Sequence, residues 1–418
     1  MVSGSTALLI AYGGAHVNMV APVMRRLEEA GVRCVLMALT TGFGIARRLG
    51  LEALGYRDFL HLVDDPEQIL AWGRELSEGN EHPDVDAHET YCYLGINFAD
   101  WVATEGYTAA RERFQTTGRR GFLPHRFARR LLDYLNPSIV VATCTPRTEQ
   151  ACIEAALDKG IPTLTMLDLF GMPGDAFVAR PRHADRIAVL NEFVRANLLA
   201  AGISSGRVVC TGNPAFDAIA DPIHLSKAQD IRERLGWHDL RVVMWAGQVH
   251  GAYASSEWAH TRFSDFMECA LREWVKQTPG FALAVRHHPN EFQYFTMHPP
   301  QDRVFVGNPR DESLHAWLCL CDTMVVENST VGLEAALMGS RVIVPRFSPV
   351  YPFTNFQYDK GGIAIGVDSM SQLLEVLRFS NTLNQRSRMR EFHVGDAAQR
   401  VANEVLKLLS PVFTGDKK

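Results

Sequence analysis

Short apolar runs alternate along the chain with amphipathic stretches. The first run, TALLIAY at residues 6–12, is apolar at successive positions, as expected for a strand buried on both faces. The next stretch carries apolar residues at the i, i+3, i+4, i+7 spacing of one helical face, before Gly31 and a second apolar run at 32–39. These positions are Val20, Val23, Met24 and Leu27. The order predicts a strand–helix–strand unit.

The same alternation recurs through the rest of the chain. Further strands are predicted at 138–143, 161–167, 186–190, 207–212, 241–247, 281–289, 323–327 and 341–347. Further helices are predicted at 147–159, 191–201, 261–277, 371–379 and 386–409. Strands that alternate with helices in this way favour doubly wound parallel sheets. Because 418 residues exceed what one hydrophobic core usually supports, we expect two domains.

The fold class predicted is α/β, with two Rossmann-like domains facing a cleft. We expect a first domain at 1–212, a linker region at 213–240 and a second domain at 241–418, whose last helix could pack back on the first domain. A segment at about 64–133 is rich in aromatic residues and breaks the strand–helix rhythm, which predicts a helical insertion in the first domain. Its aromatic side chains could bury the insertion against the sheet or line an acceptor site.

Composition restricts the class of protein. A net charge of −5 argues against a protein that binds nucleic acid through its charge. The eight cysteines are scattered without a Cys-x-x-Cys pair, which indicates reduced thiols in a cytoplasmic protein and no zinc site. We expect no signal peptide, and no apolar run reaches the roughly 18 residues of a membrane span. The protein could still act at the inner face of a membrane.

The first candidate site follows the strand that ends at 327, since ligands of open parallel sheets bind at the carboxyl ends of strands. Ser329 is placed to cap a helix that begins near Thr330, and free backbone N–H groups there would suit a pyrophosphate. Glu334 lies one turn later, where its carboxylate could accept the hydroxyl groups of a ribose. The alternative is a capped helix with an exposed glutamate.

A second candidate site is RHHPNE at 286–291, at the end of another strand. One of His287 and His288 would contact phosphate and the other would pack, because neighbouring residues of a strand point to opposite sides. Asn290 and the backbone near Gly247 and Gln248 complete the predicted nucleotide-sugar site.

The third candidate site follows the first strand. Gly14, after Gly13, allows close approach of a ligand to the backbone, and Asn18 as a helix cap would leave His16 on the preceding loop. A histidine near its ordinary pKa can take a proton from an attacking hydroxyl group. His16 could instead contact phosphate or simply occupy a turn.

Together these stretches resemble two-domain glycosyltransferases of GT-B architecture over most of the chain. GAHVNMVAPVMRRLEEAG at 14–31 resembles the Gly-His-Val-Asn-Pro opening of transferases whose histidine deprotonates the acceptor, with Met19 where proline is usual. It is equally similar to the Gly-Thr-Arg-Pro-Glu opening of UDP-N-acetylglucosamine 2-epimerases. VVCTGNPAFDAI at 208–219 is similar to the Thr-Gly-Asn-x-x-x-Asp segment of those epimerases and of lipid A disaccharide synthase.

RHHPNE and ENSTVGLEAALMGSRVIV, at 327–344, resemble the His-Pro and Ser/Thr motifs of bacterial capsule transferases that use cytidine- or uridine-linked sugars. The resemblance implies a UDP- or CMP-linked sugar as co-substrate. We expect no other cofactor and no metal, since helix-dipole and histidine contacts would stabilise the departing phosphate. The resemblance also implies nucleotide binding by four residues. They are His288, Ser329, Thr330 and Glu334.

Departures from the epimerase pattern favour a transferase. The epimerases carry an arginine in the opening turn where this chain has Gly14, and Gly-Asp-Thr where it has Thr143, Cys144 and Thr145. Their His-Val-Glu-Ala-Gly corresponds to TMLDLFG, which leaves Asp168 as the acid. Epimerisation at carbon 2 removes a proton from carbon and eliminates the nucleotide, which needs several carboxylates near the sugar.

The resulting hypothesis is a glycosyltransferase of bacterial surface polysaccharide or glycoconjugate synthesis, with His16 and Asp168 as catalytic residues. Its acceptor would be a glycan, a lipid-linked molecule or a protein, and it could form a homodimer. One alternative is a UDP-N-acetylglucosamine 2-epimerase or hydrolase that uses Asp168 and a histidine. The other is a nucleotide-sugar-binding protein without catalytic activity.

Overall fold

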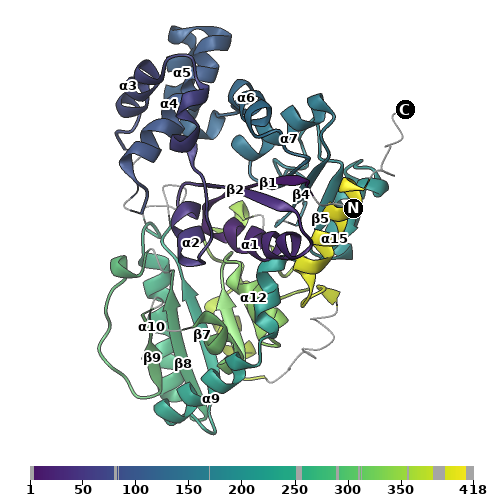
Figure 1. Cartoon of the computed structure of the whole chain (residues 1–418). Coiled ribbons are helices and arrows are strands. Elements are labelled where there is room, and N and C mark those ends of the chain that lie inside the picture. Colours follow the sequence, from purple (N-terminus) through teal and green to yellow (C-terminus); the bar gives the residue numbers. More distant parts are fainter. Residues whose placement is uncertain are drawn as a thin grey trace. The chain divides into compact units, whose positions relative to one another are not determined.

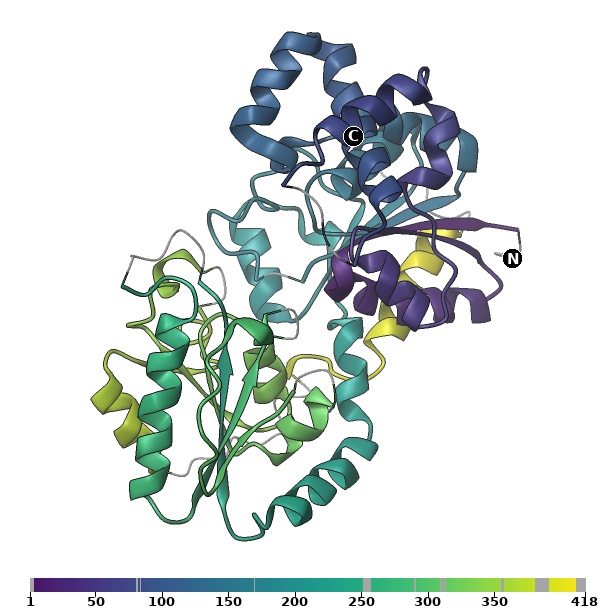
Figure 2. The same cartoon turned by 90° about the vertical axis from the view of Figure 1, so that its left-hand side faces the viewer.

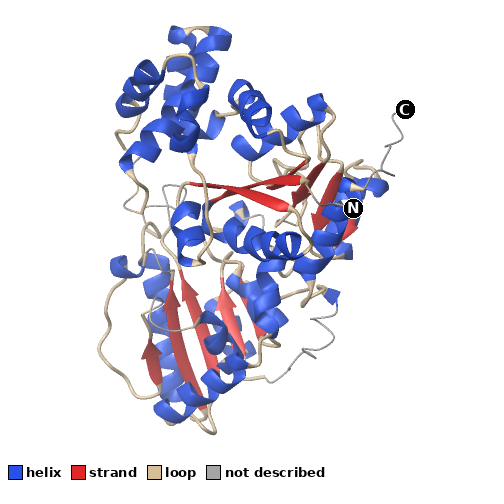
Figure 3. Ribbon diagram, in the orientation of Figure 1, coloured by secondary structure: helices blue, strands red, loops and turns tan. Residues whose placement is uncertain are grey.

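The chain forms two compact units, each an α/β domain. The computed structural model describes residues 4–79, 82, 84–168, 170–250, 257–288, 291–308, 311, 313–354, 357–379 and 391–410. Unit 1 comprises Met1–Asp217 and Asp396–Lys418, and unit 2 comprises Ala218–Gly395 (Figure 1). Each unit contains a six-stranded parallel sheet with helices around it (Figure 3). The predicted fold class of two Rossmann-like domains is confirmed.

The sheet of unit 1 has the strand order β2-β1-β3-β4-β5-β6. Its strands are β1 (Thr6–Tyr12), β2 (Arg33–Leu39), β3 (Ile139–Thr143), β4 (Thr163–Met166), β5 (Arg186–Val189) and β6 (Val208–Cys210). The chain passes from β1 to β2 on one side and then crosses to β3 on the other. The carboxyl ends of β1 and β3 therefore flank the point where the strand order reverses, where such sheets bind ligands.

Alternate residues of β1 enter two different cores. Leu9 packs with Val20 and Val401, on the face covered by α1 (Gly13–Glu29) and α15 (Ala397–Leu409) (Figure 1). Leu8 and Ile10 face the opposite core, with the helices that follow β2 and β3. Both faces of the sheet are buried, which explains why the strand is apolar at successive positions.

The predicted insertion is helical. The remaining helices of unit 1 are α2 (Gly42–Arg48), α3 (Pro66–Glu75), α4 (Ala87–Glu105), α5 (Tyr107–Thr117), α6 (His125–Leu135), α7 (Thr148–Lys159) and α8 (Glu192–Ala200), with short 3₁₀ turns at Tyr56–Leu62, Gly118–Gly121, Ser205–Arg207 and Pro214–Ala220. Tyr93 and Trp101 of α4 are buried in the core. Helices α3 and α4 approach so closely that a Cβ atom on Gly95 would lie 2.1 Å from the carbonyl oxygen of Ile69.

The start of α1 differs from the prediction. The helix begins at Gly13, and Asn18 lies inside it and is not its cap. His16 is therefore in the first turn of the helix and not on a loop. The reason is the backbone of Gly13, whose φ of 76° lets the chain turn directly from β1 into the helix.

The sheet of unit 2 has the strand order β12-β11-β10-β7-β8-β9, with helices on both sides (Figure 2). Its strands are β7 (Arg241–Gly247), β8 (Phe281–His287), β9 (Val304–Val306), β10 (Thr323–Val326), β11 (Arg341–Pro345) and β12 (Ile365–Val367). Its helices are α9 (Ile223–Leu235), α10 (Arg262–Gln277), α11 (Leu314–Leu320), α12 (Val331–Leu337) and α13 (Met370–Val376), with 3₁₀ turns at Phe292–Tyr294 and Tyr351–Phe353. Strand order here reverses between β7 and β10.

The chain enters unit 2 after Asp217 and returns to unit 1 at Asp396. The division lies inside the range 213–240 that we expected to be a linker, and α9 of that range belongs to unit 2. The last helix was predicted from 386. In the structure α15 begins at Ala397, while 386–390 lie outside the described residues. The Asp217 carboxylate accepts the backbone N–H groups of Ala397 and Ala398, at 2.9 and 2.8 Å, and so fixes the start of α15 in unit 1.

Candidate active site

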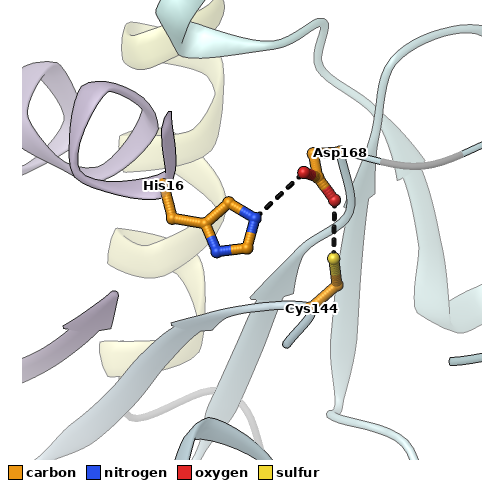
Figure 4. Close-up of side chains that lie close together, drawn as sticks. All are labelled: His16, Cys144 and Asp168. Carbon is orange, nitrogen blue, oxygen red and sulfur yellow. Dashed lines mark hydrogen bonds and ion pairs between the residues drawn. The ribbon is translucent and has the colours of Figure 1, made fainter. Parts of the chain in front are cut away.

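The two predicted catalytic residues meet at the carboxyl edge of the unit 1 sheet. His16 lies in the first turn of α1, directly after β1, and Asp168 lies just beyond β4. The Nε2 atom of His16 is 2.9 Å from Oδ2 of Asp168, to which it donates a hydrogen bond (Figure 4). The residues are far apart in sequence, and the parallel order of β1, β3 and β4 brings them together.

The second ring nitrogen of His16 faces hydroxyl groups. Its Nδ1 atom is 2.9 Å from the Oγ1 atoms of both Thr143, at the end of β3, and Thr145. Thr143 also hydrogen-bonds Oε1 of Glu149 at 3.0 Å. Glu149 lies in the first turn of α7 and is completely buried. The order carboxylate–imidazole–hydroxyl is that of catalytic triads, in which the imidazole takes a proton from the hydroxyl group.

Two carboxylates determine the electrostatics of His16. Burial by itself would lower the pKa of His16, but the hydrogen bond and negative charge of Asp168, with the charge of Glu149, raise that pKa above its ordinary value. Burial would raise the pKa of Asp168, but the hydrogen bond and positive charge of His16 hold it below its ordinary value. Burial raises the pKa of Glu149 to about 7. Both shifts favour the charged forms of His16 and Asp168.

Cys144 adds a third group to this cluster. Its thiol donates to Oδ1 of Asp168 at 2.7 Å (Figure 4). Its backbone carbonyl accepts a hydrogen bond from Arg180. One ring nitrogen of His16, Sγ of Cys144 and a carboxylate oxygen of Asp168 lie within 4.8 Å of one another, and such atoms can hold a metal ion. Since the Asp168 carboxylate already accepts hydrogen bonds from both partners, we interpret the cluster as a proton-transfer network.

Arg147 and Gly14 lie close to this network. The guanidinium of Arg147 stacks on the ring of Tyr12, 4.0 Å from its centre, and its backbone has a φ of 85°. Such strained backbone is concentrated at functional sites. Gly14, predicted to contact the ligand, leaves room for Ile45 of α2, whose Cγ1 would lie 2.9 Å from a Cβ atom there.

In unit 2 the structure distinguishes the two adjacent histidines. His287 is buried, stacks on Phe295 with ring centres 3.7 Å apart, and has its Nε2 atom 3.5 Å from Oε2 of Glu268. His288 is exposed. His287 is therefore the packed member of the pair, and His288 is the member that a ligand can reach. Asn290 lies outside the described residues.

Gly247 and Gln248 lie next to His287, at the end of β7. A Cβ atom on Gly247 would be 2.5 Å from Nδ1 of His287, so a glycine is needed beside this ring. The backbone of Gln248 is bound on both sides by Ser264, whose hydroxyl accepts from its N–H at 3.1 Å and donates to its carbonyl at 2.8 Å.

The helix that follows β10 begins one residue later than predicted. Ser329 accepts the backbone N–H of Val331, at 3.4 Å, while Thr330 is the N-cap residue, makes no capping hydrogen bond and is exposed. Glu334 pairs through Oε2 with Nε2 of His315 in α11, at 3.0 Å. The prediction did not include His315, which packs against the ring of His224.

The sequence analysis also missed a polar cluster at the reversal point of the unit 2 sheet. Nε2 of His250, after β7, is 2.9 Å from Oε2 of Glu327, after β10, and Ser348 donates to the same oxygen. The side chains of His250 and Glu327 are fully buried. The cluster ties together the loops that follow β7, β10 and β11.

No family model matches this sequence, and none of the curated proteins matches it. Solved structures do match. The UDP-GlcNAc 2-epimerase from Neisseria meningitidis, bound to UDP-GlcNAc, is 13% identical with a TM-score of 0.57, covering 96% of this chain and 100% of its own. The UDP-GlcNAc 2-epimerase from Methanocaldococcus jannaschii, in complex with UDP-GlcNAc and UDP, is 14% identical with a TM-score of 0.58, covering 96% and 99%. The glycotransferase of kitacinnamycin is 14% identical with a TM-score of 0.57, covering 97% and 99%.

These likenesses extend over nearly the whole chain. The protein therefore has the fold of the UDP-GlcNAc 2-epimerases and GT-B glycosyltransferases, as the sequence motifs indicated. Among the helices that the structure describes, none has both the length and the apolar character needed to cross a membrane.

Proposed function

We propose that this protein is a glycosyltransferase that moves a sugar from a nucleotide-sugar donor to a hydroxyl group of an acceptor. The observation that carries the proposal is the position of His16 between the Asp168 carboxylate and two hydroxyl groups. An imidazole held in this way accepts a proton from a hydroxyl group and passes it on, which sugar transfer to an alcohol requires.

Each group has one role in the proposed reaction. Asp168 holds Nε2–H of His16, so that the lone pair of the neutral ring is at Nδ1. In the proposed reaction the hydroxyl group of the acceptor lies where the Thr145 hydroxyl group lies in this structure, within hydrogen-bond distance of Nδ1 of His16. As the acceptor oxygen attacks the anomeric carbon, its proton moves to Nδ1, and the bond between that carbon and the donor phosphate breaks. The nucleotide leaves with the electron pair of that bond.

Unit 2 supplies the nucleotide site in this proposal. His288 follows β8, and Ser329 and Thr330 follow β10, with β7 between these two strands; all three side chains could donate hydrogen bonds to phosphate. UDP in the solved epimerase complex supports a uridine-linked donor. The predicted roles of Gly14, Gly247, Gln248, His287, Asn290 and Glu334 at the donor stay predictions. The acceptor class, a cytoplasmic location, attachment to a membrane and a homodimer also stay predictions.

The first experiment is thermal stabilisation by UDP, CMP, CDP, GDP and ADP. A nucleotide at about a hundred times its dissociation constant adds roughly 2.7 kcal/mol to the stability of the folded protein, which is an easily measured shift. We expect UDP to give the largest shift. Stabilisation by none of the five would remove the basis for a nucleotide-sugar enzyme.

The second experiment is transfer with the sugar library that the bound nucleotide selects. His16→Ala should lower kcat/KM by about 10²- to 10⁴-fold while the shift with UDP is unchanged. His61→Ala, an exposed histidine of the same unit, is the control and should keep full activity. Full turnover by His16→Ala would exclude His16 as the base.

A 2-epimerase or hydrolase is the second candidate, and one observation favours it. Glu149 and Asp168 place two carboxylates around His16, which partly restores the acidic character that the sequence pattern lacked. This candidate predicts free N-acetylmannosamine from UDP-N-acetylglucosamine without any acceptor. A third outcome, tight nucleotide binding without turnover of any donor, would indicate a binding protein.

A further inference from the structure

We propose that Glu149 and His16 share one proton through the hydroxyl group of Thr143, which makes Glu149 the proton store of the site. The sharing follows from the geometry of unit 1 alone. Its use in turnover rests on the proposed function, in which His16 must be returned to its neutral form after each transfer.

The three groups form a continuous hydrogen-bonded path. Nδ1 of His16 is 2.9 Å from Oγ1 of Thr143, and the same oxygen is 3.0 Å from Oε1 of Glu149. The direct distance from Nδ1 to Oε1 is 3.9 Å, too long for a hydrogen bond. Among the described residues, the Thr143 hydroxyl is the group through which a proton can pass between His16 and Glu149.

The single proton of the Thr143 hydroxyl creates two alternative states. If Glu149 is a carboxylate, Thr143 donates to it, and the Thr143 oxygen accepts Nδ1–H of a positively charged His16. If Glu149 is protonated, it donates to Thr143, which then donates to the lone pair of a neutral His16. Both states contain the same number of protons and the same net charge, and they differ only in which residue holds one proton.

Burial makes the protonated form of Glu149 accessible. The side chain of Glu149 is completely buried, and its second oxygen, Oε2, has no hydrogen-bond partner among the described residues. A carboxylate with one oxygen unsatisfied in the protein interior is costly, whereas a protonated carboxyl group is much less so. The pKa of Glu149, which burial raises to about 7, agrees with this.

The other ionisable groups around the pair come from several elements. Asp168 accepts a hydrogen bond from the other ring nitrogen of His16, Nε2. Near Glu149 lie Arg147, at the start of α7, and Cys152, within α7. Tyr93 of α4 and Arg180, beyond β4, also interact with the charge of Glu149. The two arginines favour the carboxylate, but neither forms an ion pair with it in the described residues. The proton of the pair is therefore not committed to His16.

In the proposed reaction, Glu149 takes up the proton that leaves the acceptor hydroxyl group. The reaction starts with neutral His16 and Glu149 as a carboxylate, so that the pair holds no shared proton. The acceptor proton moves to Nδ1, Nδ1–H donates to Thr143, and the proton of Thr143 moves to Glu149, which leaves the pair with its one proton. His16 returns to the neutral form without a water molecule at its ring. Because Glu149 affects the acceptor proton only through His16, we class it as a positioning residue and not as a catalytic residue.

The test is a pH titration of the His16 ring nitrogens by NMR, in protein labelled with ¹⁵N-histidine, with His16→Ala to assign the signals. A negative charge within about 4 Å raises a histidine pKa by about 1 or more. In Glu149→Gln, we therefore expect the midpoint of His16 to fall by about one pH unit relative to the wild type. An unchanged midpoint would overturn the proposal.

Thr143→Val and Thr145→Val are matched variants, because each removes one hydroxyl group from Nδ1 and only Thr143 contacts Glu149. The shift caused by Glu149→Gln should persist in the Thr145→Val background and shrink in the Thr143→Val background. Equal shifts in the two backgrounds would exclude Thr143 as the link. If Glu149→Gln does not fold, a larger fall of the His16 midpoint in Thr143→Val than in Thr145→Val supports the link, and equal falls exclude it.

Turnover measured on the same variants separates this inference from the proposed function. If transfer occurs, the pH–rate profile of Glu149→Gln should move to lower pH by the shift that NMR reports, and a profile that does not move would exclude Glu149 as a store in turnover. If no sugar is transferred by any variant, the proposed function fails, while the NMR titrations still decide whether the proton is shared.

Discussion

Replacement of Glu149 by glutamine should change how the stability of the protein depends on pH. Glutamine has nearly the shape of the protonated glutamate and cannot ionise. The pKa of Glu149 is about 7 in the folded chain and 4.5 in the reference state, a difference of about 2.5. At about 1.4 kcal/mol per pKa unit, this corresponds to about 3 kcal/mol.

The sign follows from proton binding. The folded state holds a proton on Glu149 between pH 4.5 and 7, where the unfolded chain does not, so stability decreases as pH rises through this range. The raised pKa of His16 acts in the same direction, above the pKa of an unfolded histidine. The lowered pKa of Asp168 changes the stability of the protein only below pH 3.8, the reference pKa of the group, where the stability falls as the pH falls. Because glutamine does not titrate, the Glu149→Gln variant should lack the loss of stability that Glu149 causes as the pH rises, which reaches up to about 3 kcal/mol at pH 8.

The assay is urea unfolding of both proteins at pH 5 and pH 8. The measured quantity is the difference in unfolding free energy between variant and wild type, which should favour the variant more at pH 8. Any constant effect of the substitution on the Thr143 hydrogen bond cancels in this comparison. Glu112→Gln, at an exposed position of α5, should change stability by less than about 0.5 kcal/mol at either pH. A difference that is the same at both pH values would refute the reasoning.

Three further predictions concern stability. Gly95→Ala should cost about 3 kcal/mol or more in urea unfolding, since its Cβ would lie 2.1 Å from a carbonyl oxygen. Gly44→Ala in α2, where the nearest atom would be a side-chain nitrogen of Arg48 at 3.9 Å, should be neutral or stabilising, and equal effects of the two substitutions would contradict the packing of α3 on α4. Asp217→Ala should cost about 1–2 kcal/mol and speed hydrogen exchange in the first turn of α15, and unchanged exchange there would show that the carboxylate is not its cap. Glu327→Gln should cost about 1–3 kcal/mol in chemical denaturation, because it replaces the buried carboxylate that His250 and Ser348 contact by hydrogen bonds, and a loss below about 0.5 kcal/mol would argue against these bonds.

The long apolar strands could be predicted from the sequence almost to the residue. The ranges 6–12 and 241–247 coincide with β1 and β7, because a strand buried on both faces is a continuous apolar run between polar ends. The strands β9 and β12 were missed. Each has only three residues, most of them incompletely buried, so neither leaves an apolar run in the sequence.

The candidate site was predicted in part. His16 and Asp168 were chosen by motif, and the sheet order that joins them was not available from the sequence. Glu149 was missed because His16, to which Thr143 links it, lies far from it in the chain. The available signal was a glutamate that shares a helical face with Cys152 and Ile153, since an acid among apolar residues of a buried face usually has a function or a partner. His250 and Glu327 were missed for the same reason.

The return of the chain to unit 1 has a consequence for biosynthesis. Unit 2 is continuous from Ala218 to Gly395, whereas unit 1 is completed by α15, whose Val401, Val405 and Leu408 close the core against α1 and β3. Helix α15 is synthesised after the whole of unit 2, so α1 lacks its contacts with α15 until then. Unit 1 therefore cannot complete its core before unit 2 has been synthesised. Unit 2 can fold before unit 1 is complete. The network around His16 belongs to unit 1 and so becomes rigid after that.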